Sequence, residues 1–235
     1  MRPWCGTANL TPATDPEKYP LTALAALPDP MPLFPLQTVL YPGALLGLKI
    51  FEARYLDMIS ECMRMQQPFG VVCMKQGTEV DRRNQSRQGA SAVLLESVGV
   101  AARIDDVDAE QTGILQVRCT GMQRFRLLEA PVQRDNGLWV GRTESIAEDP
   151  ARSPGPAMQH TVTALAEAIR KLQEHDRTPF AEPYRLSDAG WVANRWCELL
   201  PVSLAAKQKL MELDDPVIRL SLVDGFLRDK KVVVG

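Results

Sequence analysis

Residues 32–55 read PLFPLQTVLYPGALLGLKIFEARY, and this stretch says more about the fold than any other part of the sequence. Three of its first eleven residues are proline, which fixes the backbone and removes an amide donor. Pro42 followed by Gly43 is typical of a tight turn, and apolar residues then alternate with Gly47 and Lys49. We therefore expect a half-buried hairpin of two short strands over residues 39–50.

The period of the apolar residues changes directly after this hairpin. In FEARYLDMISECMRMQQ, residues 51–67, apolar side chains recur at helical spacing and the charges fall between them. This pattern predicts an amphipathic helix that ends near Pro68.

Short strands are expected after the helix. FGVVCMK (69–75) and AVLLESVGVAARI (92–104) are apolar and short, and the polar residues 77–91 lie between them. The polar segment carries Arg82, Arg83 and Arg87, which suit either a phosphate-binding patch or a solvated hairpin tip. We favour the hairpin tip.

The clearest strand pattern is GILQVRCTGMQRFRLL, residues 113–128. Leu115, Val117 and Cys119 point to one face, and Gly121 interrupts the alternation where a bulge or bend would sit. Continued alternation places three arginines toward solvent, namely Arg118, Arg124 and Arg126. With a last strand in GLWVGRTESI (137–146), the pattern predicts an α+β fold, in which a mostly antiparallel sheet, interrupted in sequence by one helix, curls into a small barrel or half-barrel.

The composition changes at AEDPARSPGP, residues 147–156, and the rest of the chain is predicted to be helical. An apolar stripe marks the first helix, from about 157 to 174. Ser187 and Ser203 are expected N-caps, and Asp215 with Pro216 is expected to start the last helix. We therefore expect an irregular arm at 1–30, a β lobe at 31–149 and a helical lobe at 150–235.

Charge and hydropathy restrict the function classes. Lys and Arg number 27 against 29 Asp and Glu, so the formal net charge is −2 and nucleic acid is a poor default partner. No apolar run reaches the length of a membrane span, and the N-terminus lacks the core of a signal peptide. The five cysteines form no CxxC pair. We expect a cytoplasmic protein with reduced, mostly buried thiols.

Familiar catalytic motifs are absent from the sequence. It contains no GxxxxGK[ST], GxGxxG, GxSxG or HExxH. His160 and His175 lie about four turns apart on one expected helix and cannot share a small site. The carboxylates at 105, 106 and 108 are expected in a solvated turn, and those at 214 and 215 at a helix start. We expect no cofactor, no metal and no enzymatic activity.

One helix offers a candidate binding surface. WVANRWCELL, residues 191–200, places polar side chains beside two tryptophans, and such a face next to the barrel could line a groove. Trp191 and Trp196 lie on different sides of this helix, so at least one of them is expected to face the core. The candidate peptide-binding residues are Trp191, Asn194, Arg195, Trp196 and Glu198.

The opening stretch resembles the N-terminal, substrate-binding domain of the Lon protease family. The likeness extends over residues 31–228, through VGVAARI, CTGMQRFRLLEA and, more weakly, LPVSLAAKQKLMELDDPVIRLSLV. The residues that match the family's motifs are Phe34, Pro35, Leu36, Pro42, Gly43, Phe51, Glu52, Arg54, Tyr55, Arg124 and Phe125. The resemblance implies a PUA-like pseudo-barrel followed by a helical lobe, with Glu52 and Arg54 tying the first helix to neighbouring backbone.

The resemblance also implies a function. In the full-length proteases this domain helps to recognise protein substrates, while separate modules unfold and cut them, and neither module is found in this sequence. We therefore expect a stand-alone, non-enzymatic module that captures exposed or unfolded polypeptide segments, as an adaptor or regulator of proteolysis. RNA binding is the first alternative, since PUA-like barrels elsewhere bind RNA, and a small-molecule enzyme is the second. The oligomeric state stays open.

Overall fold

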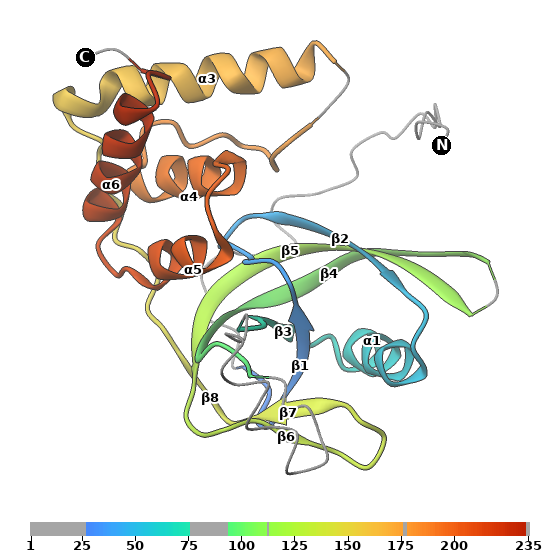
Figure 1. Ribbon diagram of the computed structural model, residues 1–235. Coiled ribbons are helices and arrows are strands. Elements are labelled where there is room, and N and C mark those ends of the chain that lie inside the picture. The colour runs from blue at the N-terminus through green and yellow to red at the C-terminus, as the bar shows by residue number, and fades with distance from the viewer. Residues whose placement is uncertain (1–26, 76–93, 112, 176–177, 234–235) are drawn as a thin grey trace, which may run out of the picture.

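The computed structural model describes residues 27–75, 94–111, 113–175 and 178–233, and Figure 1 shows a curled sheet beside a group of helices. The strands are β1 (Met31–Leu36), β2 (Leu45–Ile50), β3 (Phe69–Cys73), β4 (Val98–Gln111), β5 (Ile114–Leu127), β6 (Val132–Gln133), β7 (Trp139–Gly141) and β8 (Thr143–Ser145). The helices are α1 (Ala53–Met65), the 3-10 turn η1 (Pro156–Met158), α3 (Gln159–Gln173), α4 (Ala189–Leu199), α5 (Leu204–Glu212) and α6 (Pro216–Asp229). The expected α+β class is confirmed.

The eight strands form one sheet in the order β2-β5-β4-β3-β1-β7-β6, with β8 paired to β5. The β1–β3 pair is parallel, and the other pairs of named strands are antiparallel. In Figure 1 the sheet curls around α1, while α3 to α6 gather at the other side of the molecule. The expectation of a curled, mostly antiparallel sheet with one helix is therefore confirmed.

The prolines of β1 sit where this strand has a partner on one side. Pro32 pairs with Val140 of β7, and Pro35 pairs with Val72 of β3. A proline cannot donate to a ladder, so it is tolerated at positions where one side of the strand needs no donor. The prolines thus let β1 change partners along its length.

The expected hairpin over 39–50 is wrong, although its turn is correct. Ala44 N donates to Tyr41 O at 3.0 Å, and Gly43 has a φ of 74°, which its lack of a side chain permits. Gly43 N donates to Gly121 O at 2.8 Å, and Gly121 N donates to Ala44 O at 2.9 Å. The chain leaves this turn as β2. This strand pairs with β5, and not with residues 39–41 as the expected hairpin required.

The expected solvent exposure of Arg124 is wrong, because β5 contains a bulge. Val100 of β4 pairs with Arg124 and Ala102 pairs with Gly121, so the step of two residues in β4 faces a step of three in β5. The extra residue reverses the alternation after Gly121. Arg124 therefore lies on the inner face with Val117, buried, and not toward solvent as expected.

The helical segment follows the expected pattern with one change. Val162, Leu165 and Ile169 form the buried stripe of α3. Asp188, not the expected Ser187, caps α4 by accepting from Gly190 N at 2.9 Å. Ser203 caps α5 and Asp215 caps α6, as expected. Ser187 and Asp188 are both good N-cap residues, so the sequence alone did not separate them.

The main apolar core is shared by strands and helices. It contains residues such as Tyr41, Val100, Val192 and Leu220 from both halves of the chain. A smaller cluster on the other face of the sheet includes Phe125. The division near residue 150 separates strands from helices, and as a domain boundary it stays a prediction.

Most of the expected arm at 1–30 and the arginine-bearing segment at 77–91 fall outside the described residues. None of the helices in the described ranges has both the length and the apolar character needed to cross a membrane.

Candidate functional site

Arg195 of α4 joins the helices to the turn that precedes β2. Its Nη1 donates to Gly43 O at 2.6 Å and its Nη2 to Pro42 O at 2.7 Å. The guanidinium is fully buried, and its carbon lies 5.3 Å from the ring centre of Phe180. Arg195 therefore fixes where β2 begins relative to α4.

The structure buries most of the candidate residues of α4. Asn194, Arg195 and Trp196 are buried, and Trp196 Nε1 donates to Thr161 O at 3.1 Å. These three side chains serve the interior, because Arg195 bonds to the turn before β2, Asn194 to Arg219 of α6 and Trp196 to α3. Trp191 is partly buried against Phe180 and Tyr184. Peptide contact by Trp191 and Glu198 stays a prediction.

Glu198 reaches the surface beside this joint. Its side chain is 20% exposed, and Oε1 lies 2.7 Å from Arg195 Nη2. Burial raises the pKa of Glu198 to about 7, although Arg195 and Lys207 both act to lower it. Lys207 Nζ donates to the backbone oxygen of Glu198 at 3.0 Å. An acid, an arginine and a lysine thus meet at one edge of the sheet.

A pocket opens at this meeting point. Its volume is about 170 Å³, and its walls come from the segment before β2, the start of β2, α4 and α5. The lining residues are Thr38, Val39, Leu40, Ala44, Leu45, Leu46, Glu198 and Lys207. We call this the junction pocket. Five of the eight lining residues are apolar, whereas Thr38, Glu198 and Lys207 add polar groups, so the pocket has room for one side chain in a mixed polar and apolar setting.

The exposed residues of β2 continue from the junction pocket. Leu45 is 47% exposed, Gly47 and Lys49 are exposed, and Phe51, just after the strand, is 67% exposed. These four residues occupy alternate positions, so their side chains lie on one face. We call them the β2 strip. It presents apolar groups at both ends and one charge between them.

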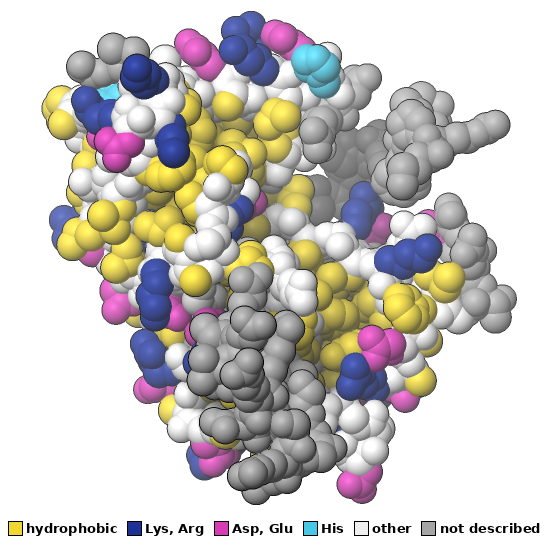
Figure 2. Space-filling model, viewed as in Figure 1, with side chains coloured by type: hydrophobic (Ala, Val, Ile, Leu, Met, Phe, Trp, Pro, Cys, Tyr) yellow, Lys and Arg dark blue, Asp and Glu magenta, His cyan; other side chains and the backbone are white. Residues whose placement is uncertain are grey.

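Apolar side chains also reach the surface elsewhere. Figure 2 shows them gathered over the helices and again in the region between β1, β2 and α1. On α6, Ile218 and Leu222 are more than half exposed and lie one turn apart. The β2 strip differs from this helical patch because it adjoins a pocket.

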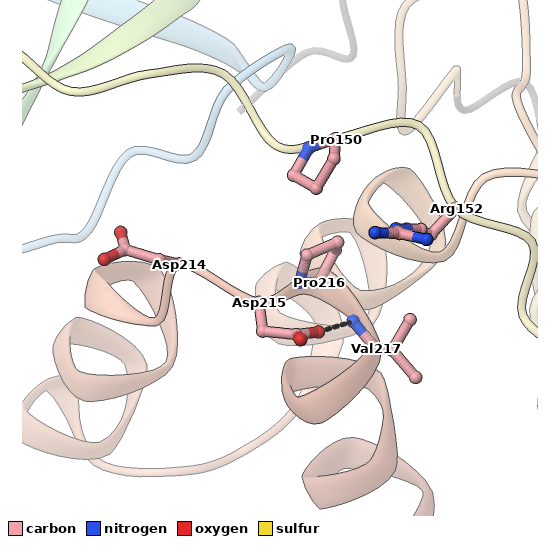
Figure 3. Close-up of a pocket in the computed structure, with 6 residues that line it drawn as sticks. All are labelled: Pro150, Arg152, Asp214, Asp215, Pro216 and Val217. Atoms are coloured by element: carbon pink, nitrogen blue, oxygen red, sulfur yellow. Dashed lines mark hydrogen bonds between the residues drawn. The ribbon is translucent and has the colours of Figure 1, made fainter.

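A larger, more open pocket of about 460 Å³ lies at the start of α6. It is lined by Pro150, Arg152, Asp214, Asp215, Pro216 and Val217. Figure 3 shows the Asp215 carboxylate turned to the first amides of α6, where it accepts from Val217 N at 2.8 Å. Asp215 is thus used to cap the helix, and the second acid, Asp214, is exposed and pairs with Arg124 at 3.3 Å.

Next to this pocket, one carboxylate is shared by two buried arginines. Arg124 Nη2 of β5 donates to Asp149 at 3.2 Å, and Arg219 Nη1 of α6 donates to the same carboxylate at 2.5 Å. Arg124 Nη1 also donates to Met211 O and Leu213 O, each at 3.0 Å. Burial lowers the pKa of the Arg124 guanidinium. This group clamps the sheet to α5 and α6 through the segment between them.

The arginines proposed for RNA do not form one exposed stripe. Arg124 is buried in the clamp, and Arg118 is paired with Asp106 at 2.8 Å. Arg126 is exposed, whereas Arg82, Arg83 and Arg87 fall outside the described residues. Two of the three described arginines are therefore paired with carboxylates, and such neutralised charges do not support a phosphate-binding surface.

The expected turn around residues 105–108 is wrong, because these carboxylates lie within β4. Asp105 is paired with Arg103 at 2.9 Å and accepts from Thr120 Oγ1 at 2.6 Å.

His160 Nε2 lies 2.7 Å from Asp224 Oδ1 on the outer side of the helical part. In the part of the chain that the structure describes, no three potential ligands converge on a metal site.

The described thiols are buried rather than reactive. Cys62, Cys73, Cys119 and Cys197 are free and buried. Burial raises the pKa of Cys62 to about 11, of Cys119 to about 12 and of Cys197 to about 11. These groups are protonated at neutral pH and act as small apolar side chains.

The motif residues of the opening stretch have structural contacts. Phe34 stacks on Tyr55 with ring centres 4.2 Å apart, and Arg54 Nη1 donates to Gly137 O at 2.9 Å. Glu52 pairs with Arg54 at 2.6 Å. The expected tie between the first helix and neighbouring backbone is therefore present. Phe51 is the exception, because it is exposed.

Sequence reasoning missed the β2 strip although a signal was present. In residues 45–51 the polar or small positions are 47 and 49, yet Leu45 and Phe51 share their face. Two apolar residues on the outer face of an otherwise alternating strand are a departure from the pattern. The junction pocket left no such signal, since α4 and α5 complete it from more than 150 positions further along the chain.

Comparison with known proteins gives one consistent result. Residues 30–229 match the protein family described as the ATP-dependent protease La (LON) substrate-binding domain. The chain is 28% identical over 222 residues to a Lon protease of Paraburkholderia phytofirmans, and 24% identical over 217 residues to one of Anaeromyxobacter dehalogenans. These matches cover 92% and 88% of this chain, but 26% and 24% of the relatives, so the chain spans about a quarter of their length.

Solved structures agree with this match. A Lon N-terminal domain protein from Xanthomonas campestris is 32% identical with a TM-score of 0.65, over 83% of this chain and 96% of that one. The N-terminal domain of a Mycobacterium avium complex Lon protease has a TM-score of 0.57 at 16% identity, over 85% of this chain and 98% of that one. The second likeness shows the fold alone.

Proposed function

Because the chain belongs to the family of Lon protease substrate-binding domains, we propose that it is a non-enzymatic module that captures exposed or unfolded segments of other proteins. In this role it acts as an adaptor or regulator of proteolysis. The family match over residues 30–229 is the observation that carries the proposal. This match supports a substrate-recognition module as the functional class. The nature of the client is our inference.

The surface chemistry supports this proposal. A module that binds unfolded chains needs apolar surface that its own fold leaves uncovered. Leu45 and Phe51 provide such surface on the β2 strip, and the junction pocket adjoins it. The residues that line this pocket include no serine, cysteine or histidine nucleophile, and the raised pKa of Glu198 follows from burial. These observations favour binding over the enzyme alternative, and the cytoplasmic location stays a prediction.

The direct test is a titration against a labelled polypeptide kept unfolded by reduction and alkylation of its cysteines. The folded form of the same polypeptide and a short RNA serve as controls, with fluorescence anisotropy read at low and moderate salt. We expect saturable binding to the unfolded form that survives moderate salt, because apolar contacts are not screened. Equal binding to the folded form would contradict the proposal. RNA binding that fades with salt would favour the RNA alternative instead.

A further inference from the structure

The strand β2 ends the sheet, and its outer edge has no strand beside it in the described part of the chain. Along an antiparallel pair, alternate residues turn their backbone groups toward the partner and away from it. The bond from Gly121 N to Ala44 O places residue 44 in the set that faces β5. Leu45, Gly47 and Lys49 therefore direct their N–H and C=O groups outward.

Other free edges of this sheet are protected in ways that β2 is not. The opposite edge, β6, has two residues. The part of β4 beyond Ala102 lies outside its pairing with β3, and it carries Arg103, Asp105 and Asp106. Short length and charge are the usual means by which proteins block strand addition. In contrast, β2 has six residues, no proline and a single charge, at Lys49.

The same edge is flanked by apolar groups. Leu45 stands at its start, beside the junction pocket, and Phe51 follows its end. The distance between these ends corresponds to an extended segment of about six residues, roughly 20 Å. Gly47, between them, has nothing within 4 Å of the place where a Cβ would be. The face of the strip between Leu45 and Phe51 is therefore open at this position.

We propose that the outer edge of β2 binds an extended segment of a client polypeptide as an added strand, with one side chain of that segment in the junction pocket. This inference rests on the proposed function and specifies its binding mode. Outward backbone groups at alternate positions match the hydrogen-bonding pattern of an extended main chain. Main-chain recognition tolerates many sequences, and the apolar ends of the strip select segments that a folded protein keeps buried.

The test compares Gly47→Pro with Gly47→Ala. Both variants add a Cβ in open space, but proline also removes the outward N–H and blocks close approach. The probe is a labelled peptide of about eight residues in which valine or leucine alternates with serine or threonine. We expect the proline variant to bind it roughly threefold to tenfold more weakly than the alanine variant.

A second measurement uses the wild-type protein and does not depend on how a variant folds. The same peptide, N-methylated at alternate amides, cannot pair along one edge and should bind more weakly than the unmodified peptide by a similar factor. Bound peptide should also slow hydrogen exchange at the amides of Leu45, Gly47 and Lys49. The amides of Leu46 and Leu48, which already face β5, should change little.

The outcomes separate the two proposals. If wild-type protein binds unfolded polypeptide but N-methylation and Gly47→Pro have no effect, the β2 edge is wrong and the proposed function stands. If wild-type protein binds neither the unfolded polypeptide nor the peptide, the proposed function fails and the edge proposal fails with it.

Discussion

Arg195 donates from Nη1 to the carbonyl oxygen of Gly43 at 2.6 Å, across a separation of 152 positions in the sequence. This bond attaches the turn that starts β2 to the middle of α4. The same arginine pairs with Glu198, so the joint between sheet and helices and the acid of the junction pocket form one structure. A change at the joint should therefore alter both stability and the pocket.

Replacing Arg195 by methionine should destabilise the protein by about 3 kcal/mol, because it leaves two carbonyl groups and Glu198 without their cation. The free energy of unfolding in urea measures this loss. The control is Arg103→Met, which breaks an exposed pair with Asp105 and should cost less than about 1 kcal/mol. Equal losses for the two variants would mean that Arg195 does not hold the joint.

Glu198 should make stability depend on pH. Its folded pKa of about 7 exceeds the ordinary value of 4.5, so the folded state binds a proton more tightly than the unfolded state. Stability due to this group is full below pH 4.5 and is lost as the pH rises toward 7. At about 1.4 kcal/mol for each unit of pKa, the loss is at most about 3 kcal/mol.

The variant Glu198→Gln removes this titration. The difference in unfolding free energy between wild type and variant should therefore change between pH 4.5 and 7 and stay constant outside that window. Urea unfolding at several pH values measures it. A difference that does not vary with pH would show that the pKa of Glu198 is the same in the folded and unfolded states.

The clamp around Asp149 should be more important to stability than its exposed neighbour. Asp149→Ala leaves Arg124 and Arg219 buried without their shared carboxylate, and we expect a loss of about 3 kcal/mol or more. Asp214 lies 3.3 Å from Arg124 but is 80% exposed, so Asp214→Ala should cost less than about 1 kcal/mol. Thermal and urea unfolding should both rank the variants in this order.

Two glycines on paired strands should differ in how much stability an alanine substitution costs. A Cβ at Gly121 would lie 2.3 Å from the carbonyl oxygen of Tyr41, so Gly121→Ala must displace the turn and should cost about 2 kcal/mol or more. A Cβ at Gly47 meets nothing within 4 Å, and Gly47→Ala should change stability by less than about 1 kcal/mol. Similar midpoints of urea unfolding for the two variants would contradict the close approach at Gly121.

Local patterns predicted those elements whose signals are contained in a few neighbouring residues. The spacing of Val162, Leu165 and Ile169 predicted α3, and the pairs Ser203–Leu204 and Asp215–Pro216 predicted where α5 and α6 begin. Caps and amphipathic stripes depend on the hydrogen bonds and burial of one helix, so they can be read without knowledge of the fold.

Distant pairing explains what the sequence left open. Residues 39–41 are apolar and suit a strand, but the partner of β2 is β5, whose paired residues lie 65 to 75 positions further along the chain. Arg124 follows an alternating pattern that predicts exposure, but the bulge after Gly121 turns it to the core. Asn194 and Arg195 are polar and suit a surface, but inside the protein Arg195 donates to the turn at Gly43 and Asn194 accepts from Arg219.

The sequence by itself determined the class of fold, the family motif, the turn at Pro42 and Gly43 and the helical second half, because each depends on residues close together in the chain. The tertiary structure alone decided that β2 ends the sheet, that α4 and α5 complete a pocket beside it, and that Leu45 and Phe51 stay exposed. Edges and pockets arise where distant segments meet or fail to meet. Long-range packing therefore decides where the proposed binding edge lies.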